Sequence, residues 1–107
     1  MVDFVHLHVH SQFSILDGAC KFPDMIEKAI ADGMQGVAVT DHGNMFGIKE
    51  FHDEACKHEG FKPIIWCETY VARRSHKDKS EVIDRKGDHL ILLAKNFKGY
   101  QNLSRLI

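Results

Sequence analysis

Apolar and polar side chains alternate over residues 5–10, near the start of the chain. In the run FVHLHVHS, apolar residues alternate with His6, His8 and His10. Successive residues of a β-strand point to opposite faces, so the pattern predicts a strand over residues 2–9 with an apolar face and an imidazole face. Imidazole is the commonest protein ligand for zinc and related metals, which indicates a metal or catalytic site. The alternative is three half-exposed polar residues on an edge strand.

Downstream, the apolar pattern switches between helical and strand periods. Helices are predicted from Pro23 to a stop at Gly33, over residues 46–59, and from an Asn96 cap to Ile107. Strands are predicted over residues 36–40, 64–71 and 89–94, with a long polar loop over 73–87. This order, β-α-β-α-β-loop-β-α, predicts an α/β fold with parallel strands and flanking helices. An open sheet or part of a barrel fits, but four strands cannot close an ordinary barrel, so we expect a piece of a longer protein.

Composition places the chain among soluble globular domains. Its 107 residues suffice for one domain, and 44% apolar with 27% charged residues is unlike a disordered segment. The net charge of −1 argues against strong nonspecific nucleic-acid binding by this segment alone. A local basic cluster remains in the long loop and is interpreted as a solvated surface, with DNA contact as the alternative; it comprises Arg73, Arg74, Lys77 and Lys79.

The cysteines indicate a reducing, cytoplasmic location. Cys20, Cys56 and Cys67 are odd in number and form no C-x-x-C pair, so neither a disulfide framework nor a cysteine-type zinc finger is supported. The N-terminus lacks the pattern of a signal peptide, and no apolar run reaches the length of a membrane span. We therefore expect no membrane association.

Polar residues with metal-binding side chains collect at the predicted strand ends. Active sites of parallel α/β folds lie at the carboxyl ends of their strands. The candidates there are His8, His10, Asp17, Asp41, His42 and Glu68. Mixed nitrogen and oxygen donors suit zinc, manganese or iron, and a set of this size has room for two or three ions. Such ions activate water and neutralise a phosphoryl oxygen.

Simpler roles exist for several candidates. Asp17 precedes Gly18 and fits an ordinary turn, and Asp41 fits a helix cap or a partner that orients a ligand. Glu68 lies in an apolar strand, where a buried carboxylate needs a partner or a metal. His89 fits the strand-end rule less well because it starts its strand. The sequence has no phosphate-binding glycine loop and no G-x-S-x-G motif.

Four segments together resemble the polymerase and histidinol phosphatase (PHP) domain: FVHLHVHSQFSILDGA, TDHGNMFGIKEF, KPIIWCETYVA and HLILLAKNFKGYQNL. The resemblance implies that residues 1–107 are about the first half of one distorted seven-stranded, TIM-like β/α barrel with a multinuclear metal site. Carried over by position, the ligands are His8, His10, Asp17, His42, Glu68 and His89, the last on the resemblance alone. His6 and Asp41 are expected to contact and orient these ligands rather than to bind metal themselves.

More narrowly, the segments resemble the N-terminal domain of bacterial DNA polymerase III alpha subunits. That resemblance implies a metal-dependent 3′–5′ exonuclease used in proofreading, with DNA and other replicase subunits as partners. Further ligands would lie beyond residue 107, so we expect this chain alone to be inactive and to self-associate through its open sheet edge. The alternatives are a structural module of the polymerase and a small-molecule phosphoesterase. Trp66 replaces a usual glycine and is expected on the face of Glu68, where its indole would crowd the metal site.

Overall fold

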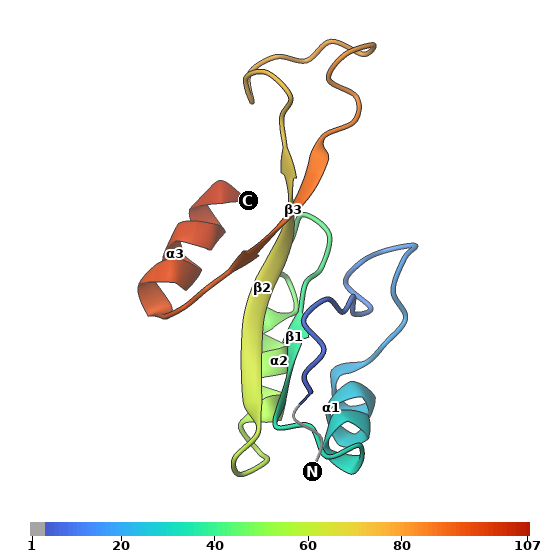
Figure 1. Cartoon of the computed structure of the whole chain (residues 1–107), viewed down its shortest axis with the longest axis vertical. Coiled ribbons are helices and arrows are strands. Elements are labelled where there is room, and N and C mark those ends of the chain that lie inside the picture. Colours follow the sequence, from blue (N-terminus) through green and yellow to red (C-terminus); the bar gives the residue numbers. More distant parts are fainter. Residues whose placement is uncertain (1–3) are drawn as a thin grey trace.

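A computed structural model describes residues 4–107, which form a three-stranded sheet with flanking helices (Figure 1). The elements are α1 (Phe22–Ala31), β1 (Gly36–Val39), α2 (Ile48–Ala55), β2 (Lys62–Val71), β3 (Asp88–Leu93) and α3 (Phe97–Leu106). The sheet order is β1-β2-β3, with β1 parallel to β2. The predicted alternation of helices and strands is therefore confirmed from α1 to β2.

The core lies where α1 packs against β1 and α2 packs against β2 and α1. Four large side chains in it, Phe22, Phe51, Val37 and Val39, are at most 1% exposed, and the two phenyl rings lie 5.4 Å apart. The packing leaves no room for a side chain at Gly47, where a Cβ would lie 2.6 Å from the ring of Phe22. This core fixes the position of β1, and the loop that follows its carboxyl end carries the candidate residues Asp41 and His42.

The predicted strand over residues 2–9 is not formed as a regular strand. Residues 1–3 lie outside the described part, and residues 4–10 run beside β1 with two backbone hydrogen bonds, from Ala38 N to His6 O (2.9 Å) and from Thr40 N to Val9 O (2.8 Å). The donors, Ala38 in β1 and Thr40 just after it, are two residues apart, but the acceptors are three apart. One extra residue is thus accommodated between positions 6 and 9, and such a slip reverses the faces of the side chains on either side of it.

The expectation of uniformly parallel strands is wrong for β3. This strand pairs antiparallel with β2, in a register that sets Tyr70 opposite His89 and Val71 opposite Asp88. The polar loop over residues 72–87 contains no helix, and a hairpin-type connection of this kind joins antiparallel neighbours, whereas parallel strands need a crossover. As a consequence, the first residue of β3 lies beside the carboxyl end of β2.

The two later helices differ from expectation in detail. The α2 helix ends at Ala55 rather than reaching residue 59, because residues 56–60 form turns and Gly60 adopts a φ of +80°. Asn96 caps α3 as predicted, accepting a hydrogen bond from Gly99 N at 3.0 Å. Phe97, at the start of α3, is 72% exposed, and α3 buries mainly Leu103. None of the helices within residues 4–107 has the length and apolar character needed to span a bilayer.

Candidate metal centre

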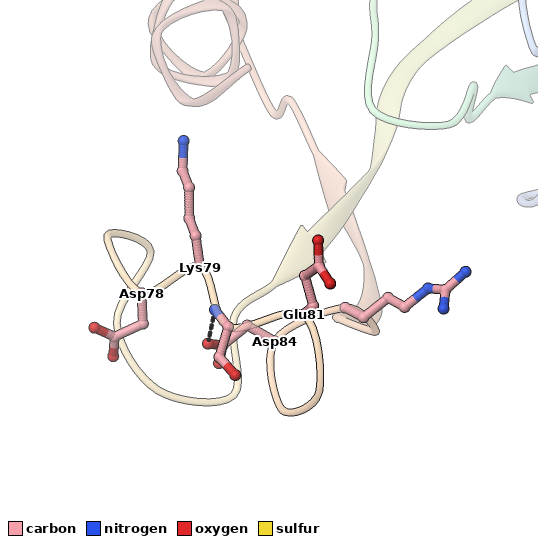
Figure 2. A pocket seen from close by; sticks show the side chains of 6 residues that line it. Asp78, Lys79, Glu81 and Asp84 are labelled. Atoms are coloured by element: carbon pink, nitrogen blue, oxygen red, sulfur yellow. Dashed lines mark hydrogen bonds between the residues drawn. The ribbon is translucent and has the colours of Figure 1, made fainter.

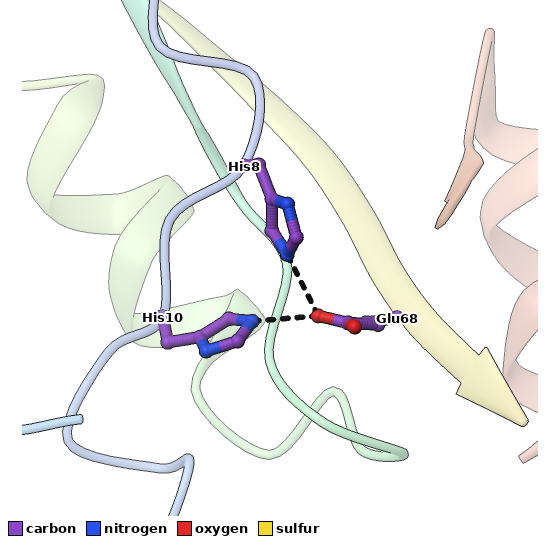
Figure 3. Close-up of side chains that lie close together, drawn as sticks. All are labelled: His8, His10 and Glu68. Carbon is purple, nitrogen blue, oxygen red and sulfur yellow. Dashed lines mark hydrogen bonds and ion pairs between the residues drawn. The ribbon is translucent and has the colours of Figure 1, made fainter. Parts of the chain in front are cut away.

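Glu68 lies at the centre of the predicted ligands. Its side chain is 4% exposed, and its Oε2 lies 2.8 Å from Nε2 of His8 and 2.7 Å from Nε2 of His10 (Figure 3). The two histidines extend from the N-terminal segment, and Glu68 extends from β2 toward both of them. The prediction that a carboxylate at this position needs a partner is met by imidazole nitrogens.

His89 reaches the same carboxylate from β3. Its Nδ1 lies 2.6 Å from Oε1 of Glu68. Because His89 is opposite Tyr70 and Tyr70 is two residues from Glu68, the three side chains share one face of the β2–β3 pair. The antiparallel direction of β3 therefore explains why a residue at the start of a strand lies with residues at the ends of others. The strand-end rule missed His89 because it assumed parallel strands.

Asp17 and His42 complete the group. Oδ2 of Asp17 lies 2.6 Å from Nε2 of His42 and 3.6 Å from Nδ1 of His10. The rings of His10 and His42 lie 4.0 Å apart, and a single parallel bridge pairs His42 with Glu68 just beyond β1. The structure thus brings together all six residues that were predicted as ligands.

Their donor atoms fall into three overlapping groups. In each group the atoms lie within 4.8 Å of one another; the groups are His8–His10–Glu68, His10–Asp17–His42 and His42–Glu68–His89. Each combines imidazole nitrogens with a carboxylate oxygen, which fits the donor preference of zinc, manganese or iron. A divalent ion in such a group would supply Lewis acidity toward a bound oxygen.

The environment of Glu68 keeps its carboxylate ionised. Burial alone would raise the pKa of Glu68, but hydrogen bonds from His8, His10 and His89, together with the charge of His42, outweigh burial and lower the pKa to about 2. An ionised carboxylate at the floor of a group of imidazoles is the form that ligates cations. The site is thus electrostatically prepared for positive charge.

Asp41 contacts none of the six imidazole or carboxylate groups directly in the described hydrogen bonds. Its carboxylate instead accepts hydrogen bonds from Ser11 N, Ser11 Oγ and Ser14 Oγ, each at 2.7 Å, and all three residues are at most 2% exposed. Ser14 Oγ in turn accepts from His42 N at 3.2 Å. Asp41 therefore ties the loop that follows His10 to the loop that carries His42. Neither serine was predicted, since nothing about a loop serine distinguishes it before the fold is known.

His6 is placed differently from expectation, whereas Trp66 lies in β2 two residues before Glu68. The structure does not bring His6 to the cluster: its ring packs edge-on against Phe4 at 4.9 Å, and it lines a separate hollow with Val9 and Met25. The one-residue slip between positions 6 and 9 is the reason, because it turns His6 away from the face of His8 and His10. Trp66 lies opposite Leu93, and its indole leaves the three histidine contacts of Glu68 intact.

The basic cluster lies in the long loop between β2 and β3. Arg74 forms a two-pronged ion pair with Asp84, at 2.5 and 3.1 Å, and Arg73 lies 4.0 Å from Asp88. The tip of the loop borders an open hollow of about 550 Å³ that is lined by both acidic and basic side chains (Figure 2). Because the arginines are paired with carboxylates of the same hairpin, the arrangement favours a solvated loop over a DNA-contacting patch.

Comparison with known proteins is consistent with this geometry. The model of the PHP domain family matches residues 6–107. The chain belongs to the PHP domain family. Its structure is similar to that of an amidohydrolase from Chromobacterium violaceum, solved with bound sulfate and no metal, with a TM-score of 0.61 and 23% identity over 94% of this chain and 32% of that one. That likeness supports the α/β fold of this PHP segment.

Curated relatives of the PHP segment are DNA polymerase III alpha subunits. Those from Treponema pallidum and Thermus aquaticus are 52% identical over 103 residues and 49% identical over 107 residues, covering 95% and 96% of this chain. The subunit from Aquifex aeolicus is 44% identical over 110 residues. In each case the chain spans only 9% of the relative's length. The similarity therefore covers the PHP segment and not the remainder of those proteins.

Proposed function

We propose that this PHP segment is the N-terminal part of a DNA polymerase III alpha subunit and contributes to a metal-dependent phosphodiesterase site that removes nucleotides from a DNA 3′ end. The observation that carries the proposal is the convergence of six donor residues from the N-terminal segment, two loops and two strands, one of which is the buried carboxylate of Glu68. The identity of 44–52% to alpha subunits supports the assignment to a replicative polymerase.

Within this proposal each residue has a defined task. The ions would be held by His8, His10, Asp17, His42, Glu68 and His89. When bound, they would supply the charge that stabilises a phosphoryl oxygen and lowers the pKa of water. Asp41 holds the loops of His10 and His42 at a fixed separation through its serine contacts.

The segment would form about the first half of a distorted seven-stranded barrel. Support comes from β3, which is an edge strand among the described residues and is free to pair with a further strand. The remaining ligands of the family would come from later in the longer protein. For that reason we propose that the 107-residue chain alone does not cleave DNA.

The activity is tested in the full-length protein that contains this chain. A DNA primer labelled at its 5′ end is incubated with Mn²⁺ or Zn²⁺ and without nucleotides, and shortening is compared for wild type, His10→Ala and His52→Ala. Shortening should fall by more than about 100-fold in His10→Ala, since even indirect partners of metal ligands cost 10–100-fold. His52, which is exposed on α2, is the matched control and should retain activity. Unchanged cleavage by His10→Ala would overturn the proposal.

A structural role is the second candidate, and one observation favours it. Glu68 joins the N-terminal segment to β2 and β3 through three histidines, so the cluster holds separate segments together. In that case the full-length protein would show no 3′ cleavage, and His10→Ala would lower its thermal stability and its polymerase activity together. A polymerase with normal stability and lost 3′ cleavage would exclude this candidate.

The partners and location follow from the same assignment. DNA and other replicase subunits are the proposed partners of the full-length protein, and a reducing cytoplasm is the proposed location. All three cysteines are free, which fits a reducing compartment. Self-association of the isolated segment is proposed through the exposed side of β3, where Leu90 and Leu93 are about half exposed.

A further inference from the structure

Tyr70 lies against the ligand cluster without belonging to it. It is the residue two positions after Glu68 in β2 and therefore shares the face of Glu68. Its hydroxyl oxygen lies 3.3 Å from Nδ1 of His42, and its ring is nearly parallel to the His42 ring, with 18° between the planes. The same ring meets His89 edge-on at 4.8 Å. The alternation of β2 was the signal from which this position could have been found.

The loop after β1 fixes the distance between Tyr70 and His42. Gly43 adopts a φ of +59°, and a Cβ at this position would lie 3.0 Å from Cε2 of Tyr70. Gly43 N also donates to Glu68 O at 2.8 Å. The close approach and the positive φ both favour glycine. With glycine at this position, the backbone next to His42 can pack directly against the ring of Tyr70.

The two ring nitrogens of His42 face different groups. Nε2 lies 2.6 Å from Asp17 Oδ2, whereas Nδ1 lies 3.3 Å from the Tyr70 hydroxyl and 3.7 Å from Glu68 Oε2. A neutral imidazole binds an ion through one nitrogen while the other nitrogen carries the proton and donates a hydrogen bond. His42 belongs to two of the three donor groups, one with His10 and Asp17 and one with Glu68 and His89. The group that Nδ1 contacts therefore determines in which of the two groups His42 can act as a ligand.

We propose that Tyr70 is a positioning residue that occupies Nδ1 of His42 and thereby reserves Nε2 for a divalent ion shared with Asp17 and His10. A hydroxyl both donates and accepts, so it suits His42 in either state. Without an ion, Tyr70 donates to Nδ1 and the Nε2–H group donates to Asp17. With an ion at Nε2, the single imidazole proton resides on Nδ1 and is donated to the Tyr70 oxygen. This inference rests on the proposed metal function.

The first test needs no metal. Two-bond ¹H–¹⁵N correlation spectra of the ¹⁵N-labelled 107-residue chain report which nitrogen of His42 is protonated. In the presence of a chelator, wild type should show His42 protonated at Nε2, and Tyr70→Phe should shift the population toward Nδ1–H. Tyr100→Phe is the matched control, because it removes the hydroxyl of the other tyrosine, which lies in α3. An unchanged His42 tautomer in Tyr70→Phe would overturn the inference.

The second test adds zinc. Wild-type His42 should bind through Nε2 and carry its proton on Nδ1, and the zinc dissociation constant, measured by competition with a chromophoric chelator, should rise about tenfold or more in Tyr70→Phe. It should stay unchanged in Tyr100→Phe. Zinc on Nδ1 of wild-type His42, or equal affinities for both variants, would overturn the inference. Absence of zinc binding by wild type would instead contradict the proposed metal function, and the metal-free spectra would still decide the contact between Tyr70 and His42.

Discussion

Replacing Asp41 with asparagine preserves the shape of the side chain and removes its charge. In the wild type, Oδ1 accepts from Ser11 N and Ser14 Oγ, and Oδ2 accepts from Ser11 Oγ, all at 2.7 Å. In Asp41→Asn the remaining carbonyl oxygen is expected to keep the first two bonds as neutral ones. The amide NH₂ group would then face the Ser11 hydroxyl, which must rotate and accept, so that its own proton loses its acceptor.

The magnitude follows from these three bonds. Loss of charge assistance in two bonds costs about 1 kcal/mol each, and an unsatisfied buried hydroxyl costs about 1–3 kcal/mol. Removal of a buried charge offsets part of this sum. We therefore expect Asp41→Asn to lower the free energy of unfolding by about 2–3 kcal/mol, a substantial share of the stability of a small domain.

Urea denaturation of the chain without metal, followed by circular dichroism, measures this change. Asp53→Asn is the control, because Asp53 lies on the exposed face of α2 and its ion pairs with Lys49 and His52 are at the surface. It should unfold at the same urea concentration as wild type. If Asp41→Asn also unfolded within about 0.5 kcal/mol of wild type, the buried network around Asp41 would not hold the two loops as described.

Three further predictions concern pH, packing and assembly. The pKa of Glu68 is lowered to about 2, so the stabilising contribution of its carboxylate is present above about pH 4.5 and is lost as the pH falls toward 2. In urea denaturation over this pH range, the free energy of unfolding of wild type should fall by up to about 3 kcal/mol more than that of Glu68→Gln. Equal losses in the two proteins would refute the role of the Glu68 carboxylate. Gly47→Ala should cost about 1–3 kcal/mol by thermal denaturation, because the new methyl group would collide with Phe13 and Phe22; wild-type stability would contradict this packing. Light scattering should find the isolated chain as a dimer or larger species through β3, and a clean monomer would contradict this.

The N-terminal histidines show what periodicity predicts and where it fails. Alternation correctly paired His8 and His10, since both reach Glu68 from one side of the segment. The same rule placed His6 with them, and the slip of one residue between positions 6 and 9 breaks that placement. A slip of this kind depends on which backbone groups of β1 are available, which is a tertiary property that the local pattern does not contain.

The direction of β3 could not be predicted from the local sequence pattern either. A strand of apolar residues reads the same in either direction, and only the helix-free connection over residues 72–87 indicates a hairpin. Knowledge of that direction would have placed His89 beside Glu68 without any resemblance to a family. Phe97 illustrates the remaining limit, because helical spacing marks an apolar stripe on α3 but does not say which part of the stripe is covered.

Metal content per chain tests the central claim most directly. The 107-residue chain, the double variant His8→Ala/His10→Ala and the surface control His52→Ala are equilibrated with limiting zinc, manganese or iron, passed through a desalting column and measured by elemental analysis. We expect at least about one ion per chain in wild type and in the control, and a loss of most of it in the double variant, since two of the three donor groups use His10. Equal metal content in all three proteins, or none in wild type, would contradict the assignment of this cluster as a metal centre.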